Sequence, residues 1–189
     1  MSRRKKATQS LIVGLLVLGL SFAQQQGWLK SATKQAEQAQ PGLYRVVTFT
    51  DGDTISVDMN GTTEKVRLIG VDTPETHDPR KSVQCFGQAA ADYTKRLIGN
   101  SSVRLEADPT NTNRDRYNRL LRYAYLPDGR RVKAEIIKQG YGFAYVNFPF
   151  TKLEEFKGYQ KEAELAKLGL WGSCEVVNQS NGQERTSDQ

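Results

Sequence analysis

The sequence predicts an α+β protein built on a small barrel of five short strands, with three helices packed beside it. Two observations lead to this prediction. Short runs rich in β-branched and aromatic residues are bounded by turn signals, which is typical of strands joined by short loops. Other segments place apolar residues at helical spacing. The 189 residues are enough for one domain of the usual ~100–200 residues.

The first three strands are expected to form an antiparallel meander. Residues 44–49 (YRVVTF) lead into the turn signal DGDT at 51–54. Residues 54–59 alternate with period two, and Asn60-Gly61 predicts a hairpin turn. The third strand is expected over residues 62–71 (TTEKVRLIGV).

The later elements mix helices and strands. The first helix is expected within residues 85–100, where apolar side chains recur at helical spacing and Gly99-Asn100 end the segment. Strands are expected at 103–108 and 120–126, a short helix at 132–140, a brief extended segment at 143–148, and a third helix over 153–171.

Both ends of the chain are expected to lie outside the folded domain, which we place at residues 43–175. Residues 1–23 combine basic SRRKK with an apolar run and small residues at its end, as in a secretory signal peptide. The apolar run is shorter than the ~20 residues that span a bilayer. We therefore expect export, to the periplasm or the medium; the alternative is an uncleaved anchor at residues 7–23. A linker is expected over 24–42, and a disordered polar tail over 176–189.

Net charge and cysteine content exclude few classes of function. The net charge is +6, but four basic residues lie in the first 23, and the remainder has 23 basic against 21 acidic residues. Anion binding must therefore come from local clustering. Cys85 and Cys174 could form one disulfide in an exported chain, or remain two buried thiols. A zinc site is not expected, because His77 is the only histidine and no cysteine pair has ligand spacing.

Carboxylates are expected to converge at one end of the meander. Asp53 precedes the second strand, whereas Asp72 and Glu75 follow the third, so the antiparallel arrangement would bring Asp53 near Asp72. Such a group would favour a hard cation such as calcium. Two alternatives remain: Asp53 as an ordinary turn residue, and Thr73 as the N-cap of a helix, which Pro79 would keep short.

Arginines supply the opposite charge. Arg67 lies inside an apolar strand, where a charge is costly unless it is paired or faces solvent. The segment NRDRYNRLLR places four arginines and Tyr117 in a short stretch, which is either a solvated loop or a phosphate-binding one. A cation, two arginines and a carboxylate that activates water would suit phosphodiester hydrolysis.

The segments DGDT, VRLIGVDTPET and DRYNRLLRYAY, in this order, resemble the staphylococcal nuclease (thermonuclease) family. FAYVNF and LGLW match later segments of that family, so the resemblance covers residues 44–171. It implies a five-stranded OB-fold barrel with three helices. It also implies a calcium-dependent nuclease that cleaves DNA and RNA and leaves 3′-phosphate ends.

The resemblance assigns roles residue by residue. Asp53 and Asp72 would bind calcium through their carboxylates, and Thr73 through its backbone carbonyl. Glu75 would be the general base, or would position the attacking water, and would reach calcium through water. The residues implied to contact substrate are Arg67 and Arg119 at the scissile phosphate, Arg116 and Tyr117 at the nucleotide, and Tyr145 near the base pocket.

Several positions depart from the family pattern. Where the family has Tyr-Gly-Arg-Gly, this chain has Asn118 and Leu120 in place of the glycines. Asn tolerates a left-handed backbone, but Leu would misdirect Arg119 if its position required positive φ. Asn147 replaces a second tyrosine and predicts weaker stacking. A non-catalytic nucleic-acid-binding OB module is the alternative function; in either case DNA and RNA are the expected partners, with no obligate protein partner and a monomeric state.

Overall fold

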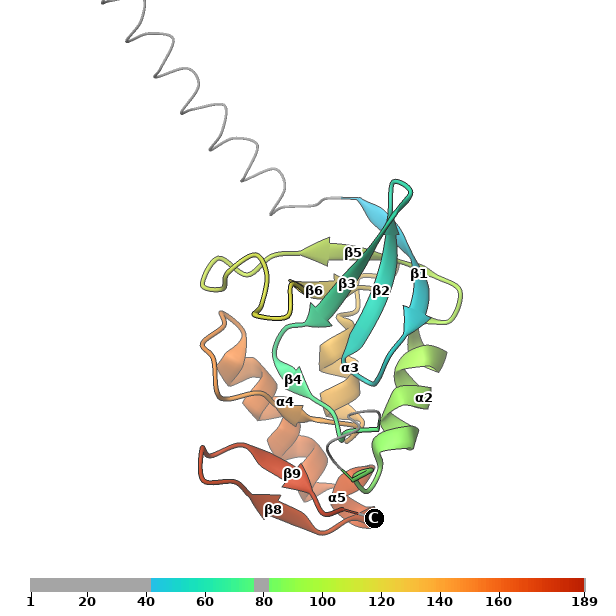
Figure 1. Ribbon diagram of the computed structural model, residues 1–189. Helices are drawn as coiled ribbons and strands as arrows, with labels where there is room; N and C mark the ends of the chain where they lie inside the picture. Colours follow the sequence, from blue (N-terminus) through green and yellow to red (C-terminus); the bar gives the residue numbers. More distant parts are fainter. Residues whose placement is uncertain (1–41, 77–81, 189) are drawn as a thin grey trace, which may run out of the picture. The chain divides into compact units, whose positions relative to one another are not determined.

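The computed structural model describes residues 42–76 and 82–188 (Figure 1). The expected signal peptide or anchor, nearly all of the expected linker, and His77 lie outside the described residues. The strands are β1 (Leu43–Phe49), β2 (Thr54–Met59), β3 (Thr62–Leu68), β4 (Val71–Asp72), β5 (Ser102–Glu106), β6 (Leu120–Tyr125), β7 (Phe143–Ala144), β8 (Val176–Asn178) and β9 (Glu184–Thr186). The helices are α2 (Gly87–Ile98), α3 (Val132–Lys138), α4 (Leu153–Leu165) and the one-turn α5 (Leu170–Ser173).

Five strands close into a barrel in the order β1-β2-β3-β6-β5, with β5 returning to pair with β1. The pairs β1–β2, β2–β3 and β5–β6 are antiparallel, whereas β3 and β6 are parallel. Asn60 and Gly61 both have positive φ, as the predicted tight hairpin requires. The predicted α+β barrel with three helices beside it is confirmed, with α2, α3 and α4 as those helices.

The barrel is filled by alternate strand residues, because successive side chains point to opposite faces of a strand. Ile55 and Val57 on β2 and Val66 and Leu68 on β3 are at most 1% exposed. Figure 1 shows α3 below the barrel, between α2 and α4, and Ile136 of α3 is fully buried. The core therefore runs from the barrel interior onto α3 and α4.

The expected third strand is broken at Gly70. Gly70 has φ 88°, and a Cβ there would lie 2.7 Å from Phe150 and 2.8 Å from Phe156, so only glycine fits. The chain leaves the barrel after β3, and β4 pairs with β7 outside it. This small second sheet carries Asp72 at its edge, which positions one of the predicted site residues.

The third helix was expected to continue as far as residue 171, and this boundary is wrong. Lys167 and Gly169 both have positive φ, so α4 ends at Leu165 and α5 begins after the break. The backbone of Gly169 lies against that of Gly140: a Cβ on Gly169 would lie 2.2 Å from the Gly140 carbonyl oxygen. This close approach joins the end of α3 to the start of α5.

The prediction of a disordered tail over 176–189 is wrong for the described part of that segment. Strands β8 and β9 form an antiparallel hairpin, and Gln183 and Thr186 are 2% and 0% exposed. The hairpin has few apolar residues, and polar side chains bonded to backbone groups elsewhere in the chain hold it in place. Cys85 and Cys174 form a disulfide with a Cα–Cα distance of 6.0 Å. No helix in the described ranges is long and apolar enough to cross a membrane.

Candidate active site

A groove of about 1360 Å³ runs along one side of the barrel. Its walls come from the turn after β1, the β3–β4 segment, the loop before β6 and the segment after β7. Arg67, Asp72, Glu75, Arg116, Tyr117, Arg119 and Tyr145, all predicted as site residues, line it. Asp53 and Thr73 lie behind its surface, at 1% and 9% exposure.

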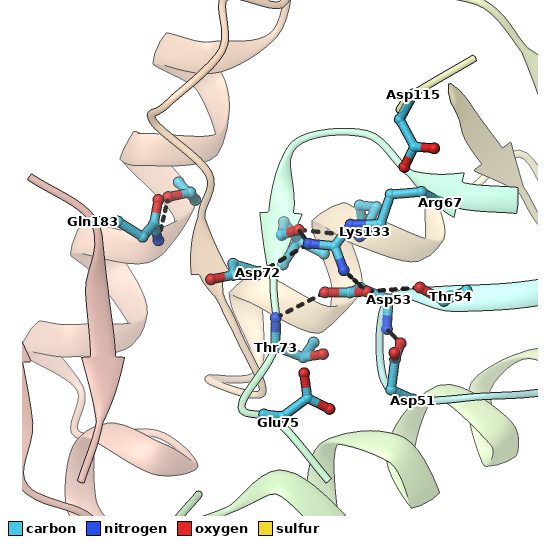
Figure 2. Close-up of polar contacts among 12 residues, drawn as sticks. Asp51, Asp53, Thr54, Arg67, Asp72, Thr73, Glu75, Asp115, Lys133 and Gln183 are labelled. Carbon is cyan, nitrogen blue, oxygen red and sulfur yellow. Dashed lines mark hydrogen bonds and ion pairs between the residues drawn. The ribbon is translucent and has the colours of Figure 1, made fainter. Parts of the chain in front are cut away.

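Arg67 holds two of the predicted carboxylates together (Figure 2). Its Nη1 donates to Asp53 Oδ1 in an ion pair, and its Nη2 lies 3.0 Å from Asp72 Oδ1. The register of the β2–β3 hairpin, which pairs Thr54 with Arg67, brings the end of β3 beside Asp53. The expected proximity of Asp53 and Asp72 is thus confirmed, and Arg67 is paired as its place in an apolar strand required.

Asp53 is buried but well supplied with donors. Its Oδ2 accepts a hydrogen bond from the Thr73 N–H at 3.1 Å, and its Oδ1 accepts one from Thr54 Oγ1 at 3.1 Å. Its own N–H donates to Asp51 Oδ1 at 2.9 Å. No helix begins at Thr73, so the helix-cap alternative is wrong. Asp53 is more than a turn residue, because its carboxylate joins the DGDT turn to β4.

Glu75 follows on an irregular segment, and its carboxylate is drawn near Thr73 in Figure 2. The Thr76 N–H donates to Glu75 Oε1 at 2.9 Å. The N–H and the carbonyl of Glu75 are both hydrogen-bonded to Gln84, which precedes α2. Glu75 therefore has a fixed backbone and a side chain at the groove.

Asp115 orients Arg119. The Asp115 carboxylate accepts hydrogen bonds from the Arg119 N–H at 2.9 Å and from Arg119 Nε at 2.7 Å. Burial acts to raise the pKa of Asp115, but these bonds outweigh it and the pKa is lowered. Asn118 has φ 63°, so it keeps the left-handed turn as expected, while Leu120 lies in β6 and needs no positive φ. Arg119 Nη1 lies 3.4 Å from Thr54 Oγ1, beside Asp53.

The other arginines of the loop have different surroundings. Arg114 forms a two-point ion pair with Glu64 at 2.9 and 3.1 Å, and Arg122 is fully buried. Arg116 donates to the Tyr117 hydroxyl at 2.7 Å and lies 4.8 Å from its ring centre. Tyr117 is 59% exposed, so this pair offers a cation and an aromatic surface on the groove wall. The solvated-loop interpretation fits neither Arg114 nor Arg122.

Sequence reasoning missed two residues beside the site. Asp51 lines the groove and could have been noticed as the first acid of the DGDT turn. Lys133 on α3 is 1% exposed, with Nζ 3.5 Å from the Val71 carbonyl oxygen. Its burial, and next the nearby Arg67 charge, lower the pKa of Lys133 well below its usual range. No local signal marks it, since a single Lys in a helix is ordinarily exposed.

The oxygen donors around Arg67 suit a hard cation better than a soft one. Among the residues that the structure describes, no group of three or more His, Cys, Asp or Glu side chains is close enough to hold a metal alone. Asp53 and Asp72 are carboxylates, and Thr73, whose N–H is bonded to Asp53, has a backbone carbonyl as a further oxygen donor. Calcium accepts carboxylate, carbonyl and water oxygens together, so the donor types fit.

We compared the sequence with those of known proteins and protein families. The sequence model of one family, described as "Staphylococcal nuclease homologue", matches residues 65–173.

The chain belongs to the staphylococcal nuclease family. It is 38% identical over 174 residues to the thermonuclease of Staphylococcus hyicus. The aligned region covers 89% of this chain and 99% of that protein. The thermonuclease of Staphylococcus intermedius is 37% identical, over 89% of this chain and 98% of its own length. The SPbeta prophage-derived endonuclease YokF of Bacillus subtilis is 42% identical over 64% of this chain, which matches 41% of that protein.

Proposed function

We propose that the chain is a calcium-dependent nuclease that hydrolyses phosphodiester bonds of DNA and RNA and leaves 3′-phosphate ends. Relatives named thermonuclease and endonuclease support nuclease activity. The observation that carries the proposal is the convergence of Arg67, Arg119 and Glu75 on one groove, with Asp53 and Asp72 beside Arg67.

The two arginines would bind the scissile phosphate. Arg119 is oriented by Asp115, and Arg67 by Asp53 and Asp72, so both guanidinium groups are fixed before substrate arrives. Arginine matches a phosphate with paired N–H donors. Negative charge grows on the phosphoryl oxygens in the transition state, so fixed cations stabilise it more than the ground state.

Glu75 would take a proton from the attacking water. The water oxygen attacks phosphorus, the P–O5′ bond breaks, and the leaving 5′ oxygen takes up a proton. The phosphate remains on the 3′ oxygen. A general base needs a place within hydrogen-bond reach of the water, and Glu75 is at the groove.

Asp53, Asp72 and the Thr73 carbonyl would hold calcium, which supplies positive charge beside the phosphate when bound. Their oxygen donors fit that ion. Arg116 and Tyr117 would hold the nucleotide, and Tyr145 would lie near a base; Tyr145 is 5.8 Å from the ring of Phe148. Asn147 lines the groove in place of the aromatic ring that the family pattern suggests, so stacking there would be weaker.

Residues 1–23 would act as a signal for export, and the enzyme would act outside the cytoplasm as a monomer. N-terminal sequencing of the exported product tests this assignment. A mature product that begins near residue 24 agrees with cleavage, whereas an intact N-terminus in the membrane fraction indicates the anchor at residues 7–23.

The activity is tested with residues 24–189 on single-stranded DNA and on RNA, with calcium and with a chelator. We expect calcium-dependent cleavage and 3′-phosphate ends, and we expect Glu75→Gln to lower kcat by about 10²-fold or more. Nucleic acid that binds but is not cleaved would instead indicate the non-catalytic OB module. Gln88→Ala is a suitable control, because Gln88 is exposed and its side chain donates to Asp92, which is also exposed and is not a residue of the proposed site.

A further inference from the structure

The backbone of Glu75 is held by a glutamine that the proposed mechanism does not use. We propose that Gln84 is a positioning residue that fixes Glu75 for catalysis, and that the C-terminal hairpin and the disulfide hold Gln84 in turn. This inference rests on the proposed role of Glu75. It concerns how the groove keeps its geometry, and it assigns a role to the segment after residue 174.

Gln84 contacts Glu75 at two points. Gln84 Oε1 accepts a hydrogen bond from the Glu75 N–H at 2.8 Å, and the Gln84 N–H donates to the Glu75 carbonyl at 3.0 Å. Both backbone polar groups of one residue are thus satisfied by one partner, as in a short stretch of paired strands. Because the two bonds hold the peptide units on either side of the Glu75 Cα, they fix the backbone from which the Glu75 side chain extends to the groove.

The start of α2 closes against the same peptide. The Gly87 N–H donates to the Gln84 carbonyl at 3.0 Å. A Cβ on Gly87 would lie 2.8 Å from the Glu75 carbonyl oxygen and 2.8 Å from Thr76 Cγ2. The backbone at Gly87 therefore packs directly on Glu75, with no space for a side chain at residue 87. A shift of the segment from Gln84 to Gly87 would move the backbone of Glu75 with it.

The opposite side of Gln84 is bound to the C-terminal strand. The Cys85 N–H donates to the Ser187 carbonyl at 2.9 Å, and Thr186 Oγ1 donates to the Cys85 carbonyl at 2.7 Å. Gln84 also pairs with Asp188 in an antiparallel bridge. The disulfide from Cys85 to Cys174 adds a covalent tie beside these bonds.

The contacts form a continuous path from the hairpin to the proposed base. Thr186 is fully buried, so its hydroxyl bond is shielded from water. The path matters for rate, because displacement of a catalytic group by about 1 Å can reduce turnover by about 10²-fold. Loss of the Gln84 acceptor would leave the Glu75 N–H without this bond and free its peptide to move.

The experiment compares kcat and KM for Gln84→Ala, Gln84→Glu, Thr186→Val and the control Gln88→Ala, with Glu75→Gln as reference. We expect Gln84→Ala to lower kcat about 10–100-fold with KM changed less than about threefold, since the phosphate-binding arginines are untouched. Gln84→Glu keeps an acceptor oxygen at the same reach and should restore most of kcat. Thr186→Val should lower kcat less than Gln84→Ala, and Gln88→Ala should leave it unchanged.

Normal kcat in Gln84→Ala, together with a strong loss in Glu75→Gln, would overturn this inference and leave the proposed function intact. Normal activity in Glu75→Gln would instead overturn the proposed role of Glu75. If Gln84→Ala does not fold, as judged by near-UV circular dichroism, Thr186→Val decides: a folded Thr186→Val enzyme with unchanged kcat refutes the path.

Discussion

Removal of the Cys85–Cys174 disulfide should cost several kcal/mol of stability. The bridge joins residues 89 apart in sequence, so it closes a loop of about 90 residues in the unfolded chain. In the chain-entropy model such a loop lowers the unfolded-state entropy by about 15.5 cal/mol/K, or about 4.6 kcal/mol at 25 °C. The relation of about 2–4 °C per kcal/mol for a chain of this size gives a fall in Tm of about 9–18 °C.

The double variant Cys85→Ser/Cys174→Ser tests this value in urea, followed by far-UV circular dichroism. The midpoint should fall while the native spectrum is kept, because Cys85 retains its backbone bonds to Ser187 and Thr186. Reductant should lower the midpoint of the wild-type protein toward that of the variant, and should leave the variant itself unchanged. A loss below about 1 kcal/mol would refute the loop-entropy reasoning.

Three further predictions concern buried groups and tight contacts. Burial depresses the pKa of Lys133. Between that pKa and ~10.4 the unfolded chain therefore binds more protons than the folded one, and stability should rise with pH across this window. Lys133→Met should raise Tm at pH 7 and make Tm less dependent on pH. Burial alone would raise the pKa of Asp108, but bonds from Thr110, Tyr123 and Thr151 lower it far below its usual range. Its stabilisation is therefore full above pH ~3.9 and lost as pH falls further, so Asp108→Asn should cost about 1.5–3 kcal/mol in urea at pH 7 and less at pH 3. Gly87→Ala should reduce kcat by displacing Glu75, whereas Gly158→Ala, with open space around its Cβ, should leave kcat unchanged and raise stability by about 0.5–1 kcal/mol; equal activity in the two glycine variants would contradict the first part.

The barrel could be predicted because its strands carry their own signals. Alternation, turn pairs and helical spacing are local, and they placed the barrel strands and the starts of the helices to within a few residues. The break at Gly70 depends instead on Phe150 and Phe156, which are 80 or more residues away in sequence. No property of the segment 62–71 shows that two distant rings occupy the space a side chain would need.

The tail illustrates the same limit for polar segments. Residues 176–188 have too few apolar side chains to suggest a packed element. They fold because Gln183 is buried and bonds to backbone groups of Ala144 and Val146 at 3.4 and 3.0 Å. Polar burial of this kind is favourable only when the partner groups are in place, and these partners belong to another part of the chain.

Most of the candidate site could be predicted because its motifs keep their order and spacing. The meander geometry brought Asp53 and Asp72 together, as expected, and placed Arg67 between them. Orientation could not be predicted in the same way. Asp115 fixes Arg119, and Gln84 fixes Glu75, through bonds that depend on exact loop conformations.

The pairing of Gln84 and Cys85 with residues 186–188 sets an order of assembly. Chains are synthesised from the N-terminus, so the barrel strands and α2 exist before Cys174 and the last strand are made. The groove can thus form early, but the support under Glu75 is completed only when contacts about 100 residues apart in sequence close. Full turnover should therefore be among the last properties the chain acquires, and refolding should restore the far-UV circular dichroism of the barrel and helices before it restores activity.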